Sequence, residues 1–134
     1  MPLDRVEALV DAIGKIKGAS DPSSEAYKLR NPLLIKSFAK PGKHETDDQG
    51  RRVFSSWLSG LKASYFDCHL KISGNSRAGL KPTDALANVL GVYGIKELGG
   101  IKAVVLFLRK ALDDESISKD TELSYFLAVP TEKQ

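Results

Sequence analysis

The chain has 134 residues, of which 42% are hydrophobic and 28% are charged, and its formal net charge is +3. This composition is typical of one soluble globular domain and excludes a wholly disordered chain. The longest uninterrupted apolar run, residues 103–108, is far shorter than the about 18 residues that a membrane-spanning helix needs, so we expect no such helix.

Two features of the sequence favour a cytoplasmic location. Residues 1–17 alternate charged and aliphatic side chains and lack the basic-then-apolar layout of a secretory signal. The single cysteine, Cys68, has no second cysteine with which to form an intramolecular disulfide, which agrees with a reducing compartment. We therefore expect a cytoplasmic protein.

The first predicted helix follows from apolar residues that recur at three- and four-residue steps between residues 3 and 16. Acidic residues come early in this stretch and lysines come late, as the helix dipole favours, and Gly18 marks the end. Residues 20–22 (SDP) predict the cap and first turn of a second, short helix that reaches Leu29.

The segment after Leu29 is expected to be less regular. Residues 31–32 (NP) interrupt the second helix, because the residue before a proline avoids the helical conformation. The apolar residues 33–38 predict one or two more helical turns. Residues 40–50, which are rich in turn formers and charges, form the clearest predicted loop.

Residues 51–72 are the most informative stretch, because at helical spacing they separate into an apolar arc and a basic, serine-rich face. The apolar arc consists of Phe54, Trp57, Leu58, Leu61, Tyr65, Cys68 and Ile72. The opposite face consists of Arg51, Arg52, Ser55, Ser56, Ser59 and Lys62. Small hydroxyl groups between cations let a sugar–phosphate backbone approach closely, which favours nucleic-acid contact. An ordinary solvated amphipathic helix is the alternative.

Three further helices are predicted in the second half of the chain. A polar, glycine-containing connection, residues 73–79, leads to a helix that begins at residues 82–84. The strongly apolar stretch 98–112 predicts a helix at the centre of the core, and residues 123–127 predict a last short one. Because strands with hairpin turns are not evident, the predicted fold class is all-α, a compact bundle of about five to six helices in a single domain, 1–134.

Basic residues are concentrated in the middle of the chain. Residues 28–82 hold eleven lysines and arginines but only four acidic residues, whereas each flank has a net charge of −2. A polyanion would therefore bind to the middle, unless these charges form an ordinary solvated surface. The main candidates for contact with a nucleic-acid backbone are Arg51, Arg52, Lys62, Lys71 and Arg77, followed by Arg30, Lys36, Lys40 and Lys43.

The sequence predicts neither a catalytic site nor a cofactor. His44 and its acidic neighbours are the densest set of potential metal ligands, but no second histidine or cysteine group supports them. Cys68 and His69 are adjacent, so on a helix they point about 100° apart and do not form a nucleophile and base pair. Residues 73–79 lack the lysine and hydroxyl ending of a nucleotide-binding P-loop. We therefore expect a protein that is not an enzyme, with no bound metal.

Phe66 and Leu70 are unusual, because they lie one turn apart on the basic side of the central predicted helix. A second helix of the bundle, a neighbouring subunit or a base stacked on Phe66 would cover them. Asp113 and Asp114, in the acidic C-terminal flank, are candidates for contact with basic surfaces of adjacent copies.

Three segments carry a resemblance to a known family: residues 30–34 (RNPLL), 50–58 (GRRVFSSWL) and 122–127 (ELSYFL). They resemble the helical C-terminal part of the large subunit in type I-D CRISPR effector (Cascade) complexes, a part that is also made separately as a small subunit from an internal start. The resemblance implies a non-catalytic subunit, present in several copies, that helps to hold the guide–target duplex and the displaced strand.

The partners that this resemblance implies are guide RNA, target or non-target DNA, other effector subunits and copies of the chain itself, with no membrane. Such a subunit would bind the backbone without sequence specificity, because base pairing selects the target. Two alternatives stay open. A protein-interaction adaptor or inhibitor would use Phe66 and Leu70, and a small helical DNA-binding regulator would place a recognition helix in the major groove.

Overall fold

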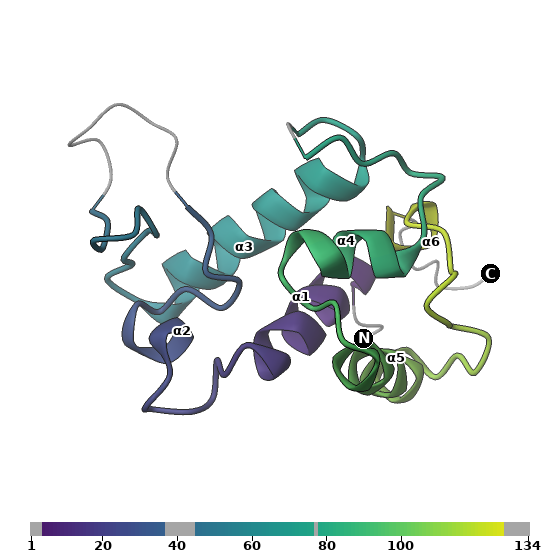
Figure 1. The fold of residues 1–134 in the computed structure, drawn as a ribbon, viewed down its shortest axis with the longest axis horizontal. Helices are drawn as coiled ribbons and strands as arrows, with labels where there is room; N and C mark the ends of the chain where they lie inside the picture. Colours follow the sequence, from purple (N-terminus) through teal and green to yellow (C-terminus); the bar gives the residue numbers. More distant parts are fainter. Residues whose placement is uncertain (1–3, 37–44, 77, 128–134) are drawn as a thin grey trace.

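The computed structural model describes residues 4–36, 45–76 and 78–127, and it confirms the all-α fold class (Figure 1). Its helices are α1 (Arg5–Ile16), α2 (Glu25–Lys28), α3 (Trp57–Ile72), α4 (Leu86–Val92), α5 (Leu98–Leu112) and α6 (Ser124–Leu127). Within the described ranges, β-structure is limited to isolated bridges such as those between Lys36 and Arg51 and between Thr46 and Arg52. None of the helices in these ranges is long and apolar enough to cross a membrane.

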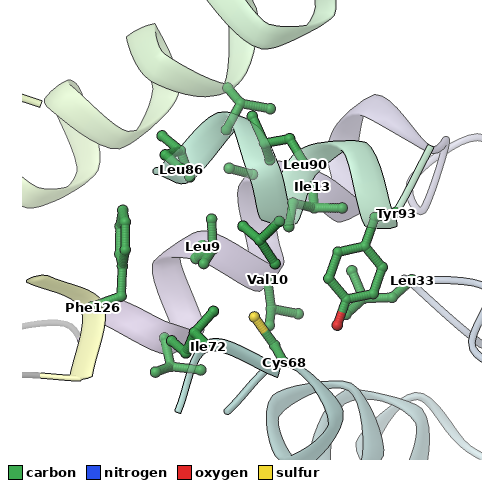
Figure 2. Packing of buried hydrophobic residues seen from close by; sticks show 14 of the residues in the cluster. Leu9, Val10, Ile13, Leu33, Cys68, Ile72, Leu86, Leu90, Tyr93 and Phe126 are labelled. Atoms are coloured by element: carbon green, nitrogen blue, oxygen red, sulfur yellow. The ribbon is translucent and has the colours of Figure 1, made fainter. Parts of the chain in front are cut away.

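Helix α1 lies at the centre of the core and contacts α3, α5 and α6. Asp4 caps its N-terminus by accepting hydrogen bonds from the N–H groups of the first turn. Figure 2 shows Leu9, Val10 and Ile13 of α1 packed among side chains of α3, α4 and α6. A helix that is apolar on most sides belongs in the interior of a bundle, which explains this arrangement.

The prediction that the apolar stretch 98–112 is central to the core is confirmed only in part, because this helix packs against α1 and adds three residues to the core. Helix α5 is present, but it buries only the stripe formed by Val104, Val105 and Leu108. Leu98 is 73% exposed and Leu106 is also exposed. The helix therefore covers one side of α1 and presents apolar side chains to solvent on its other side.

The segment between α1 and α3 differs from the prediction in two places. Helix α2 is capped by Ser24, whose hydroxyl accepts the N–H of Tyr27, and not by residues 20–22. Residues 33–36 are not helical: Leu33 lies in a turn, Leu34 has a left-handed φ of 54°, and Lys36 forms an isolated bridge with Arg51. The remainder of the predicted turns, residues 37–38, lies outside the described residues.

Helix α3 begins later than the amphipathic pattern predicted. The Ser56 hydroxyl accepts the N–H of Ser59 and so caps the helix, which places Arg51 and Arg52 in an extended segment before it. The face of α3 that is fully buried is a line of mostly small residues at four-residue spacing: Gly60, Ser64, Cys68 and Ile72. Leu58, assigned to the apolar arc, is instead 62% exposed.

Ser64 provides a test of this packing, because its buried hydroxyl has no hydrogen-bond partner among the residues that the structure describes. An unsatisfied buried polar group costs about 1–3 kcal/mol, and alanine is also the better helix former. We expect Ser64→Ala to raise the free energy of unfolding by about 1 kcal/mol in urea denaturation. Ser55→Ala, at an exposed position, should change it by less than about 0.5 kcal/mol. A loss of stability in Ser64→Ala would contradict this packing.

Candidate nucleic-acid interface

A cleft of about 680 Å³ lies where residues at the ends of α1, α3 and α4 meet the non-helical segment 33–36. Its charged lining residues are Lys17, Lys36, Lys71 and Asp67, which give a net charge of +2. The rest of the lining is mainly apolar. Three cations from separate parts of the chain are thus brought to one concave surface, where their fields add.

Lys17 is the C-cap residue of α1, where its positive charge interacts favourably with the negative end of the helix dipole. Its side chain is half-buried, and this burial lowers the pKa of the ammonium group. The charge of Arg51 lowers that pKa further. Lys17 has no ion pair with any described acidic residue, so its charge is available to an anion. The sequence analysis did not select Lys17, because it lies in the acidic N-terminal flank.

Lys71 is held in place by a polar cluster on the cleft wall. Its ammonium forms an ion pair with Asp67, and the same carboxylate oxygen accepts a 2.6 Å hydrogen bond from the Tyr93 hydroxyl. The ammonium also lies 4.8 Å from the centre of the Tyr93 ring. Burial and the neighbouring groups raise the pKa of Tyr93, so its hydroxyl stays protonated and donates. Lys71 is therefore a fixed, partly compensated cation.

Cys68 lies beside this cluster but does not take part in chemistry. It is fully buried, and burial raises the pKa of its thiol to about 12. A thiol with such a pKa is a poor nucleophile at neutral pH. The prediction that Cys68 is a small core residue is confirmed.

Lys36 reaches the cleft because the buried amide of Asn31 fixes the non-helical segment 33–36. The Asn31 Nδ2 group donates to the carbonyl oxygens of Ile35, at 2.9 Å, and Arg52, at 3.0 Å. Its Oδ1 atom accepts the N–H of Ile35 at 2.9 Å. These three bonds tie the wall of the cleft to the segment that carries Arg51 and Arg52, and they leave the Lys36 side chain exposed.

Two of the five main candidates, Arg51 and Arg52, are already engaged by other side chains of the chain. The Arg51 guanidinium pairs with Asp47 at 2.8 Å and with Glu25 at 3.4 Å, and its side chain is only 13% exposed. The Arg52 guanidinium lies over the ring of Phe54, 4.5 Å from its centre. The charge of Arg51 therefore adds to the positive electrostatic potential near Lys17, but its guanidinium is already paired with acidic side chains.

The remaining cationic candidates do not join this cleft or are not described. Lys62 is exposed on the outer side of α3, and Arg30 is exposed in a turn. Arg77, Lys40 and Lys43 lie outside the described residues. Of the predicted cations, only Lys36 and Lys71 line the cleft within the described residues. Lys17, which was not predicted, joins them, whereas Lys62 and Arg30 lie on other surfaces.

The candidate subunit contacts are partly corrected. Phe66 is 67% exposed, so no described helix of the bundle covers it, whereas Leu70 is half-buried. Asp113 is exposed at the C-cap of α5. Asp114 instead forms hydrogen bonds within the chain, since its carboxylate accepts from Ser116 and from the Tyr125 hydroxyl.

Among the residues that the structure describes, no group of three or more histidine, cysteine, aspartate or glutamate side chains could hold a metal ion. Comparisons with protein-family models, with curated proteins and with solved structures find no match.

Proposed function

We propose that the chain is a non-catalytic subunit that binds nucleic-acid backbone without sequence specificity in an RNA-guided effector complex. The observation that supports this most is the grouping of Lys17, Lys36 and Lys71 at one cleft. Ammonium groups bind phosphates as point charges and carry no information about base sequence. The resemblance of segments 30–34, 50–58 and 122–127 to the small subunit of type I-D CRISPR complexes supplies the setting, in which base pairing selects the target.

An exposed apolar face on α3 is consistent with membership of a larger assembly. Leu58 and Phe66 are 62% and 67% exposed, and they flank Lys62 at four-residue spacing. Large apolar side chains exposed together mark protein contact sites more often than free surface. The same face favours a second candidate function, a protein-interaction adaptor that does not bind nucleic acid.

Charge reversal at the cleft tests the proposal. We expect the double variant Lys17→Glu, Lys36→Glu to weaken binding to random-sequence DNA by on the order of ten-fold or more, because two phosphate-binding cations become repulsive. The slope of log Kd against log salt concentration should fall by about two units. Fluorescence anisotropy with single-stranded and double-stranded DNA, at several salt concentrations, measures both quantities.

The matched control reverses two lysines on α5. Lys102 and Lys110 are exposed and do not line the cleft, so Lys102→Glu, Lys110→Glu makes the same change in net charge elsewhere. Equal weakening by both double variants would show that binding depends on overall charge and not on the cleft. If the unaltered chain binds no DNA at low salt, the adaptor function is favoured, and a clear sequence preference would favour a DNA-binding regulator.

A further inference from the structure

The cleft that groups the lysines has a second chemical component, an apolar wall. Leu34, which is half-buried, lines it from residues 33–36, and Val92, which is 42% exposed, lines it from the end of α4. Phosphates alone would need only cations on an open surface. A volume of about 680 Å³ lies within the range of about 300–1,000 Å³ that is usual for pockets that enclose a small ligand.

The positions of the charges define the ligand's polar end. Asp67 is already occupied by Lys71 and by the Tyr93 hydroxyl, so it does not offset the charge of the other two lysines. Lys17 and Lys36 have no ion pair with described acidic residues. The ligand therefore needs one anionic group that reaches these two lysines and an apolar body that contacts the wall.

Backbone acceptors are also present at the cleft. The carbonyl groups of Val92 and Tyr93 accept no backbone N–H from the described residues, because α4 ends there and the chain turns at Gly94. Amino groups on the edge of a base are donors for such carbonyls. An acidic peptide supplies the anion, but it lacks a flat apolar body with donors along its edge.

We propose that the cleft holds one unpaired nucleotide of a single strand, with its base against Leu34 and Val92 and its phosphate between Lys17 and Lys36. This inference rests on the proposed function and deepens it, because it assigns the cleft to single-stranded nucleic acid. A base inside a duplex is stacked and paired, and its extrusion costs a few kcal/mol. A displaced or looped strand presents the same base without that cost.

An abasic strand tests the role of the base, since it keeps every phosphate and lacks only the bases. We expect the full chain to bind a random single strand about five-fold or more tightly than an abasic strand of the same length, in anisotropy measurements at one salt concentration. Val92→Gln should remove most of this preference, because it replaces the apolar surface at an exposed position without changing charge. Leu106→Gln, on the exposed face of α5, should leave the preference intact.

The outcomes separate this inference from the proposed function. Equal affinity for the normal and abasic strands overturns the nucleotide site while backbone binding stands, and so does a Val92→Gln variant that is folded by circular dichroism and keeps the preference. Displacement of the strand by polyglutamate as readily as by unlabelled strand also overturns it, in favour of an acidic peptide. Failure of the unaltered chain to bind either strand overturns both proposals.

Discussion

Asn31→Ala should lower the free energy of unfolding by about 3 kcal/mol, measured by urea denaturation. The Asn31 side chain is fully buried and makes three hydrogen bonds to the backbone of Ile35 and Arg52, at 2.9, 3.0 and 2.9 Å. Each backbone group that is left unsatisfied in the interior costs about 1–3 kcal/mol, and water that enters the vacated space offsets part of the sum. The expected loss of stability is large because the Asn31 amide joins the segment that contains Ile35 to the segment that contains Arg52.

Two control variants separate these bonds from a general effect of asparagine replacement. Asn75→Ala removes an exposed side chain with one hydrogen bond to Ser73, so we expect a change below about 0.5 kcal/mol. Asn31→Asp keeps the acceptor for the Ile35 N–H but loses both donated bonds and buries a carboxylate, so it should destabilise at least as much as alanine. Unchanged stability in Asn31→Ala would mean that the amide does not hold the cleft wall.

A consequence for binding follows from the same bonds. Lys36 lies one residue beyond Ile35, so loss of the Asn31 amide frees the segment that brings this lysine to the cleft. The position of Lys36 at the cleft thus depends on a neutral side chain that does not itself line the cleft. A polar residue next to a proline, at position 31, gave no indication of this role in the sequence.

The parts of the fold that could be predicted are those set by local rules. The apolar spacing of α1 and the positions of α4 and α5 depend on residues within a few turns of one another, although α4 begins at Leu86 and not at residues 82–84. The short helix α2 was predicted in the right place, although its cap is Ser24. Spacing and capping determine where a helix forms, but not which of its sides is covered.

The parts that could not be predicted depend on tertiary packing. Lys17 joins Lys36 and Lys71 only because the end of α1 is folded against residues far along the chain, and charge counted in sequence blocks assigned it to the acidic flank. Arg51 looked available because Glu25 is distant in the sequence and Asp47 lies in the predicted loop 40–50, where a four-residue spacing does not imply a contact. The ring of Phe54 was assigned to the opposite face of a helix from Arg52, whereas both residues precede α3. Such pairings are decided by the folded structure, and they changed the members of the candidate site.

The buried face of α3 is a second example of packing that the sequence pattern did not predict. The amphipathic pattern selected large apolar residues, including Leu58, whereas the line that packs most closely contains Gly60 and Ser64. Close approach between main chains requires small side chains, and a hydrophobicity pattern does not count glycine or serine as core. Leu58 is left on the solvent side as a result.

This close approach predicts that Gly60→Ala lowers the free energy of unfolding by about 2 kcal/mol or more. A Cβ atom at residue 60 would lie only 1.9 Å from the carbonyl oxygen of Arg30. That oxygen belongs to the main chain, at a residue with a φ of 51°, so relief requires movement of α3 or of the turn at Arg30. Overpacking usually costs about 1–3 kcal/mol, and an overlap this close with a main-chain atom should cost about 3 kcal/mol or more. The better helix propensity of alanine offsets about 1 kcal/mol of that cost.

Gly91→Ala is the matched control, because it makes the same substitution inside α4, where a Cβ atom meets nothing within 4 Å. We expect it to raise the free energy of unfolding by about 0.5–1 kcal/mol, since alanine restricts the unfolded chain and favours the helix. Opposite signs for the two variants in urea denaturation would separate packing from helix propensity. If both variants were stabilised, α3 could not lie against the turn at Arg30, and the turn that leads into residues 33–36 would lose its support.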